Sequence, residues 1–366
     1  MTRPLRVGIV GLGRIFDLNC LGYRDNPDAV VVALCDSRQD LLDRRAALFP
    51  EAQLVRGFDE LLRLEPDLVD VLTPHPLHAE MAVAAMRAGA HVSVQKPMSM
   101  TVAEADGMLA AAGETGCHLK CFENFVFYAP LVRAKALLDS GAIGRPLHFR
   151  AKIVSGDRQY AWPVPAETTA WRQALGRAGL GGPLLFDHGH HLLAVACWLF
   201  GDVRDVFARI EETTLPNGSV VDAPASLMWR HWDPPIHGIW DITAAPRMRI
   251  RTDYYPGHEQ FEIQGETGII TVTRCSDRLL DEPALTLYAD GEVRAFHNLE
   301  TDWGASFRLS TEHFIRFLRG QESRAILTGM EGRRVLAFAH ALMQSSREER
   351  PRSLPRENSS GRRHGG

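Results

Sequence analysis

The sequence predicts an α/β Rossmann domain, with a doubly wound parallel sheet, followed by an α+β domain with a large, mostly antiparallel open sheet. Two observations predict the first domain. Short apolar runs alternate with helical patterns over the first 120 residues, and a glycine-rich turn follows the first run. One observation predicts the second domain: after residue 122, strand-like segments follow one another with few helical segments between them.

The strands expected in the first domain are almost continuously apolar, as is typical of parallel strands covered on both faces. They lie at residues 5–10, 30–36, 68–73, 91–95 and 117–121. The stretches between them have helical periodicity, and several end at a glycine, where helices tend to end. We therefore assign residues 1–122 to a Rossmann domain.

The second domain is expected to begin with a helix at 129–144 and to continue mainly as strands. Strand patterns lie at 146–154, 237–245, 261–265 and 268–274, and "QGETGIIT" is typical of a hairpin with a short loop. Helical patterns return at 307–319 and 329–346. We expect residues 123–355 to form this second domain, and the polar residues 356–366 to form a disordered tail.

Composition excludes several classes of function. The formal net charge of −4 provides no basic field for nucleic acid. No apolar run reaches the roughly 18–20 residues that a membrane span needs. The six cysteines have no framework spacing, and no signal-peptide pattern precedes the first strand, so we expect reduced thiols and a cytoplasmic protein.

The first motif, "VGIVGLGRIF", predicts a dinucleotide site. Gly11 allows a tight turn after the first strand, and Gly13 lets backbone N–H groups approach a pyrophosphate. Phe16 stands where a third glycine is usual. Asp36 ends the second strand, where a carboxylate binds ribose hydroxyls and disfavours a 2′-phosphate, which indicates NAD; Arg38 leaves NADP open. The alternative is a glycine turn followed by a solvated aspartate.

The second motif places Lys96 at the carboxyl edge of the predicted sheet. Lys96 follows the strand at 91–95 and precedes Pro97, while Thr73 and Pro74 end the neighbouring strand. A lysine at this edge can donate a hydrogen bond to a substrate hydroxyl or, when desolvated, take part in proton transfer. The alternative is a surface lysine at the start of a turn.

The third motif is "GGPLLFDHGHH", at residues 181–191. In a helix over 183–199, Asp187 and His191 share a face, with His188 partly aside and His190 on another face. An Asp–His pair suits proton transfer, because the carboxylate orients the imidazole. Two alternatives are a structural His–Asp pair and a zinc site, for which one narrow helix face is an awkward scaffold. We predict no metal.

These motifs together resemble the Gfo/Idh/MocA family of oxidoreductases. "GLG", Asp36, "TPHPLH", "QKP", "WR", "GGPLLFDHGHH" and "WLFG" occur in the family's order, and the resemblance covers about residues 5–350. It implies a Rossmann domain, a second domain on a large sheet, and NAD(P)-dependent oxidation of sugars, cyclitols or related polyols. It also implies a homo-oligomer, a dimer or tetramer, with the sheet face as the interface.

The resemblance also implies a set of site residues. The catalytic residues are Lys96, Asp187 and His191, with Gln95 in place of the family's glutamate before the lysine. The substrate would contact these three together with Trp171, Arg172 and His188. The cofactor would contact Gly11, Gly13, Arg14, Ile15, Asp36, Arg38, Thr73, Pro74, His75, His78, Gln95, Lys96 and Asn124.

The reaction we expect is hydride transfer between a secondary alcohol or hemiacetal and nicotinamide. His191 takes the hydroxyl proton, Lys96 stabilises negative charge on the oxygen, and Asp187 orients His191 or binds a neighbouring hydroxyl. The sequence does not decide which of Lys96 and His191 takes the proton and which stabilises the charge. Three alternatives stay open: an enzyme that retains NAD and oxidises its substrate transiently, a dinucleotide-binding regulator without catalysis, and metal-assisted chemistry.

Overall fold

The computed structural model describes residues 3–157, 162–179, 181–215, 218–273 and 282–356. The expected tail therefore lies outside the described residues, apart from Arg356. The chain forms two compact units, each assembled from several segments. The first comprises 1–132, 162–194 and 298–336, and the second comprises 133–161, 195–297 and 337–366. A boundary at residue 122 between independently folding domains stays a prediction.

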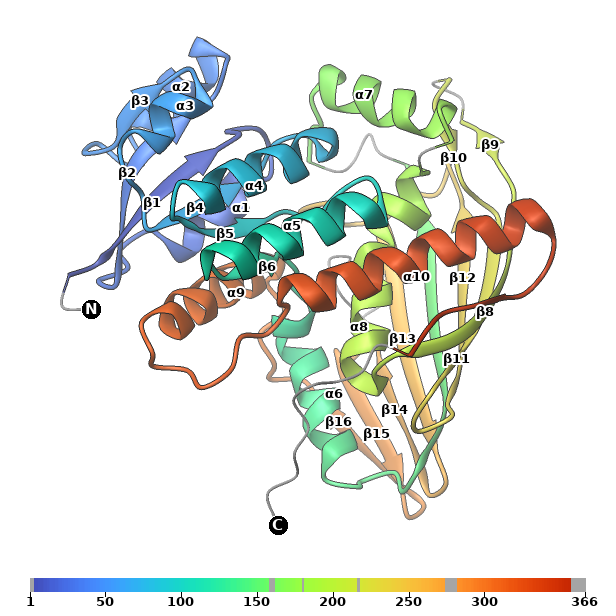
Figure 1. Ribbon diagram of the computed structural model, residues 1–366. Helices are drawn as coiled ribbons and strands as arrows, with labels where there is room; N and C mark the ends of the chain where they lie inside the picture. The colour runs from blue at the N-terminus through green and yellow to red at the C-terminus, as the bar shows by residue number, and fades with distance from the viewer. Residues whose placement is uncertain (1–2, 158–161, 180, 216–217, 274–281, 357–366) are drawn as a thin grey trace. The chain divides into compact units, whose positions relative to one another are not determined.

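The first unit contains a six-stranded parallel sheet with the strand order β3-β2-β1-β4-β5-β6 (Figure 1). The strands are β1 (Leu5–Val10), β2 (Ala29–Cys35), β3 (Gln53–Val55), β4 (Leu68–Val71), β5 (His91–Val94) and β6 (Leu119–Cys121). All five predicted strands are present; the short, largely exposed β3 was not predicted. The strand order reverses between β1 and β4, which is the point where dinucleotides bind in such sheets.

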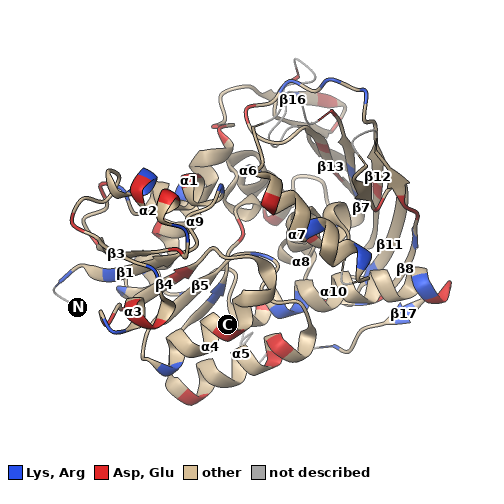
Figure 2. Cartoon of the chain, turned by 90° about the horizontal axis from the view of Figure 1, so that it is seen from above, with Lys and Arg blue, Asp and Glu red and all other residues tan. Residues whose placement is uncertain are grey.

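Helices cover both faces of this sheet. On one face, α1 (Phe16–Asn19), the 3₁₀ turn η1 (Cys20–Gly22), α2 (Gln39–Ala46) and α9 (Trp303–Leu318) enclose an apolar core with β1. The other helices of the Rossmann segment are α3 (Phe58–Leu62), α4 (His78–Arg87) and α5 (Val102–Thr115). Helix α2 carries acidic and basic residues, with Asp40 in its first turn and Arg44 and Arg45 in its last, as expected for a solvated helix (Figure 2).

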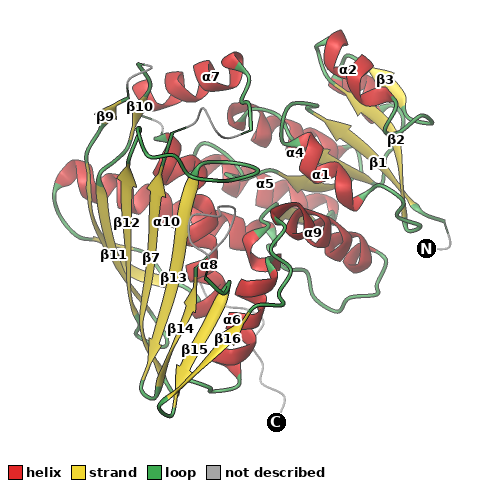
Figure 3. Cartoon of the chain, turned by 180° about the vertical axis from the view of Figure 1, so that it is seen from behind, coloured by secondary structure: helices red, strands yellow, loops and turns green. Residues whose placement is uncertain are grey.

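The second unit contains a nine-stranded sheet with the order β16-β15-β14-β13-β7-β12-β11-β8-β17 (Figure 3). All of its neighbouring strands are antiparallel except β7 and β12, which run parallel. The strands are β7 (Pro146–Ser155), β8 (Val203–Ile210), β11 (Ala225–His231), β12 (His237–Ala244), β13 (Gly257–Gly265), β14 (Gly268–Val272), β15 (Leu285–Ala289), β16 (Glu292–Phe296) and β17 (Arg352–Ser353). A separate pair is β9 (Thr213–Thr214) with β10 (Val220–Val221). The predicted fold class is confirmed, and β13 and β14 form the predicted hairpin.

The remaining helices are α6 (Ala129–Asp139), α7 (Ala166–Arg177), α8 (His190–Phe200) and α10 (Gly329–Glu348). Aromatic contacts of Phe149 with Phe200 and of Trp229 with Phe338 hold α8 and α10 against the nine-stranded sheet. None of the described helices is both long and apolar enough to cross a membrane.

One predicted element is wrong in detail. A single helix was expected over 183–199, but residues Pro183–His188 form a π-helical turn and α8 begins only at His190. The backbone N–H of Gly189 donates to the carbonyl of Leu184, five residues earlier, at 2.8 Å, which is the hydrogen bond that defines a π-helical turn. The side chains of Asp187 and His191 therefore do not have the spacing of one regular helix.

Candidate active site

The glycine-rich turn has the conformation that a dinucleotide site needs. Gly11 has φ +90°, and a Cβ there would lie 2.7 Å from the backbone carbon of Leu72, so only glycine fits. At Gly13 an added Cβ would meet no protein atom within 4 Å. The second glycine thus leaves open space in front of the turn, as close approach of a pyrophosphate requires. Phe16 packs in the core below the turn, against Phe49.

Asp36 is tied directly to this turn. Its Oδ2 accepts a hydrogen bond from the backbone N–H of Leu12 at 2.9 Å, and its Oδ1 accepts one from the N–H of Arg38 at 2.9 Å. Each carboxylate oxygen keeps a further lone pair for a ribose hydroxyl. The Arg38 guanidinium is bound by two other carboxylates, those of Asp40 and Glu167. Carboxylates therefore surround Arg38, the arginine that was predicted to leave NADP open.

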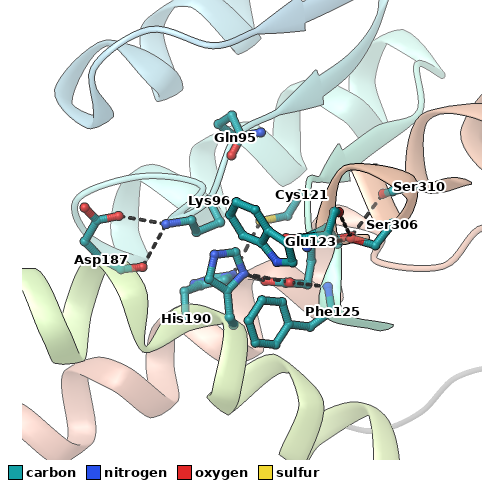
Figure 4. Close-up of polar contacts among 12 residues, drawn as sticks. Gln95, Lys96, Cys121, Glu123, Phe125, Asp187, His190, Ser306 and Ser310 are labelled. Atoms are coloured by element: carbon teal, nitrogen blue, oxygen red, sulfur yellow. Dashed lines mark hydrogen bonds and ion pairs between the residues drawn. The ribbon is translucent and has the colours of Figure 1, made fainter. Parts of the chain in front are cut away.

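Lys96 is held by Asp187. Its Nζ donates to the Asp187 Oδ1 at 2.7 Å and to the Asp187 carbonyl at 3.0 Å, as Figure 4 shows. An ammonium group has three N–H donors, so one remains for another acceptor. Arg172 approaches the second carboxylate oxygen, with Nε 2.8 Å from Oδ2. Burial opposes ionisation of Asp187, but the charges of Arg172 and Lys96 prevail and hold its pKa well below the ordinary value.

Three predicted residues of the "TPHPLH" stretch lie around Lys96 and Asp187. His75 Nε2 is 3.7 Å from Asp187 Oδ1, and its ring meets Trp171 edge to face at 4.8 Å. The ring of His78 lies between two carbonyl oxygens, Thr73 O at 2.7 Å and Pro97 O at 2.9 Å. His78 therefore joins the end of β4 to the turn that carries Lys96 and is placed to fix that turn.

His191 is held by the carboxylate of Glu123, a pairing that the sequence did not indicate. Its Nδ1 lies 2.7 and 2.8 Å from the two carboxylate oxygens of Glu123, which follows β6. Phe125 stacks on the imidazole, with 4.5 Å between ring centroids. The expected orientation of His191 by Asp187 is therefore wrong: the carboxylate bonded to His191 is Glu123, and Asp187 binds Lys96 and Arg172 instead.

The electrostatics of this pair suit proton transfer. Burial raises the pKa of Glu123, but the neighbouring His191 and His190 outweigh it, so the carboxyl ionises more readily than usual. Burial lowers the pKa of His191 below 6.5 even though Glu123 opposes the shift. The imidazole is thus neutral at pH 7, with Nδ1 at the carboxylate and Nε2 as the accepting nitrogen.

The other two histidines of the motif have different surroundings. The ring of His188 lies edge to face with that of His191, at 5.4 Å. His190 is buried with Nε2 3.7 Å from Cys121 Sγ, and burial lowers its pKa to about 3. Among the residues that the structure describes, no group of three His, Cys, Asp or Glu side chains is placed to hold a metal ion.

Asn124 and Gln95, both predicted cofactor contacts, belong to buried hydrogen-bond networks. Asn124 Nδ2 donates to Ser306 Oγ in α9 at 2.9 Å, and Gln95 Nε2 donates to Asn19 Oδ1 at 2.8 Å. Ser310, one turn after Ser306, donates to the backbone carbonyl of Glu123 at 3.0 Å. Two serines of α9 thus fix the segment that carries Glu123 and Asn124. No local pattern in the sequence signals these serines, because they lie far along the chain.

Arg14 and Ile15 complete the predicted set. The Arg14 guanidinium lies 4.3 Å from the Trp162 ring centroid and pairs with Asp17 at 3.0 Å. Ile15 packs partly buried against the apolar core. The residues of the turn and the open space at Gly13 fit a dinucleotide: backbone N–H groups can face a pyrophosphate, and Asp36 can face a ribose.

Comparisons with known proteins agree with this description. A model of an oxidoreductase family with an NAD-binding Rossmann fold matches residues 5–122, and a model of the GFO/IDH/MocA C-terminal domain matches residues 131–271. Together the two matches cover most of the chain.

Several curated relatives are named as dehydrogenases, and one is named as a glycosyl hydrolase family 109 protein. D-apiose dehydrogenase of Paraburkholderia graminis is 32% identical over 68% of this chain and 62% of its own length. Myo-inositol 2-dehydrogenase of Thermotoga maritima is 24% identical over 94% of this chain and 97% of its own length. Four curated relatives, the apiose enzyme included, are matched over only 46% to 65% of their length, so the chain spans about half to two thirds of these proteins.

A solved structure shares the whole fold. It is an oxidoreductase from Agrobacterium radiobacter in complex with NAD+, L-tartaric acid and magnesium. It superposes with a TM-score of 0.79 at 20% identity, and the match covers 95% of this chain and 98% of that one.

Proposed function

Because the chain belongs to the Gfo/Idh/MocA oxidoreductase family, we propose that it is an NAD-dependent dehydrogenase acting on a secondary alcohol or hemiacetal of a sugar, cyclitol or related polyol. The observation that carries the proposal is the Glu123–His191 pair beside the Asp187–Lys96 pair. The first supplies a neutral base, and the second supplies a fixed positive donor. A base and a cationic donor at the same oxygen both accelerate oxidation of an alcohol.

One pair accepts the substrate proton, and the other stabilises the negative charge on the substrate oxygen. His191 Nε2 accepts the hydroxyl proton, and the buried Glu123 stabilises the imidazolium that forms. Lys96 donates its third N–H to the same substrate oxygen and stabilises negative charge there, while Asp187 fixes the ammonium. Bound NAD would supply the acceptor for the hydride. Since Lys96 already donates to Asp187, we assign the base to His191.

Asp36 and the carboxylates around Arg38 support NAD over NADP. A 2′-phosphate would carry its charge toward Asp36, and Arg38 would have to leave Asp40 and Glu167 to receive it. One relative, a scyllo-inositol 2-dehydrogenase of Bacillus subtilis, is named as NADP-dependent, and the assay below therefore compares the two cofactors.

The substrate belongs to the polyol class for two reasons. Trp171 offers an aromatic surface beside the charged groups, and sugar rings stack on such surfaces. Four relatives are named as dehydrogenases of apiose, inositol, a glucoside and levoglucosan. Another is named as a dehydrogenase of a chlorinated dihydroxycyclohexadiene, which also carries ring hydroxyls. A homo-oligomer and a cytoplasmic location stay predictions.

The proposal is tested with a panel of sugars, sugar acids, inositols and glycosides. Each is assayed with NAD and separately with NADP, and the absorbance of the reduced cofactor is followed. We expect reduction with one polyol class, faster with NAD. Product formed without free NADH would instead identify an enzyme that retains its cofactor. No product, with dinucleotide bound, would favour a binding protein and overturn the proposal.

A further inference from the structure

Gln95 sits at the carboxyl end of β5, directly before Lys96, and its amide has a defined orientation. Gln95 Nε2 donates to Asn19 Oδ1 at 2.8 Å. No described residue donates a hydrogen bond to its Oε1, which is not among the solvent-inaccessible unpartnered atoms. In Figure 4 this oxygen points to the side of Lys96, and the nitrogen points away. An accessible acceptor thus faces the proposed cofactor side.

The orientation of both amides follows from a buried carboxylate. Asn19 is fully buried, and its Nδ2 lies 3.4 Å from Asp70 Oδ2, a long contact. An ionised carboxylate only accepts hydrogen bonds, so the nitrogen of Asn19 must face Asp70 and its oxygen must face Gln95. That oxygen only accepts, so Gln95 must present its nitrogen to Asn19. Its own oxygen is left for the other side.

Asp70, the carboxylate that orients the two amides, is itself held in place. Asp70, Ser93 and Lys120 lie in register on the adjacent strands β4, β5 and β6. Lys120 is buried, and its Nζ donates to the carbonyl and hydroxyl of Ser310. Burial raises the pKa of Asp70 to about 6, against the opposing influence of Ser93, Asn19, Lys120 and Tyr23. Asp70 is therefore mostly ionised at neutral pH and above.

We propose that Asn19 is a positioning residue, which fixes the Gln95 amide so that Gln95 Oε1 accepts a hydrogen bond from a hydroxyl of the nicotinamide-side ribose. Ribose hydroxyls donate hydrogen bonds, and Gln95 lies at the sheet edge beside the proposed base and lysine. Without Asn19 the amide can rotate and present its NH₂ group, which cannot accept. This inference rests on the proposed NAD-dependent function.

The test is a double-mutant cycle with Asn19→Leu and Gln95→Met, read as the dissociation constants of ADP-ribose and ADP by titration calorimetry. ADP-ribose carries the second ribose, and ADP lacks it. We expect N19L to weaken ADP-ribose binding about two- to tenfold and to leave ADP binding unchanged. In the Q95M background, N19L should have no further effect, because there is no amide left to orient. Asn26→Leu removes another structural amide of the same segment and serves as the matched control.

Each outcome separates the inference from its alternatives. A merely structural role for Asn19 would weaken ADP and ADP-ribose alike, and equally in both Gln95 backgrounds; that result would overturn the inference. Unchanged ADP-ribose binding in N19L would also overturn it. Should N19L fail to fold, Asn19→Ala gives the same cycle, and melting temperatures monitor folding throughout. Wild-type protein that binds neither ADP-ribose nor NAD would overturn the proposed function itself.

Discussion

Replacing Glu123 by glutamine should disable His191 without removing it. The carboxylate receives the Nδ1 proton at 2.7 and 2.8 Å in a fully buried setting. An amide of the same shape has no charge to stabilise an imidazolium. It can also turn its NH₂ group to Nδ1, which moves the ring proton to Nε2 and blocks acceptance from the substrate.

The expected loss can be worked from one charge-assisted hydrogen bond. Such a bond is worth about 1.5–3 kcal/mol, and each 1.4 kcal/mol is tenfold in rate, so kcat should fall roughly 10- to 150-fold. The assay is the initial rate of NADH formation with the best polyol of the panel. Glu80→Gln, an exposed position on α4, is the matched control. NAD binding and melting temperature should change little. A kcat of E123Q within threefold of wild type would refute the role of Glu123.

The remaining predictions concern the dinucleotide turn and the lysine. Gly11→Ala should lower the free energy of unfolding by at least about 1–2 kcal/mol, measured by denaturant titration, because φ is +90° and Leu72 blocks the methyl group. Gly13→Ala should melt like wild type but bind NAD more weakly by calorimetry, and equal binding would contradict the turn's role. Asp36→Ala should lower the ratio of kcat/KM with NAD to kcat/KM with NADP about tenfold. An unchanged ratio would show that Asp36 does not contact the cofactor. Asp187→Asn should lower kcat more than tenfold by releasing Lys96, and an unchanged rate would make the ion pair merely structural.

The sequence predicted those parts of the fold that depend on local pattern. Buried parallel strands are apolar along their whole length, so the runs at 5–10 and 91–95 were recognisable without their neighbours. The antiparallel hairpin near residue 266 was recognisable from its short loop. The π-helical turn was not, because a one-residue expansion of a helix leaves no mark on the sequence pattern.

The pairings that the sequence did not predict join residues that are far apart in the sequence. Glu123 lies 68 positions before His191, and only the end of β6 brings the two together. Asp187 was predicted as a site residue, and its expected partner was the histidine four positions later in an ideal helix. Its actual partner is Lys96, 91 positions away. Helix α9 likewise packs on the Rossmann sheet although it follows the nine-stranded sheet in the chain. The spacing of residues in the sequence predicts which side chains share a helix face. Pairings between distant residues are visible only in the tertiary structure.

The most direct test of the central claim compares wild type with His191→Ala in NADH formation across a pH series, at saturating NAD. The neutral imidazole is the active form, so wild-type kcat/KM should be flat at neutral pH and should fall on acidification through an inflection below 6.5. H191A should bind NAD normally, turn over at least a hundredfold more slowly, and lack that inflection. Turnover near the wild-type rate with the same acid limb would show that another group takes the proton, and would contradict the account.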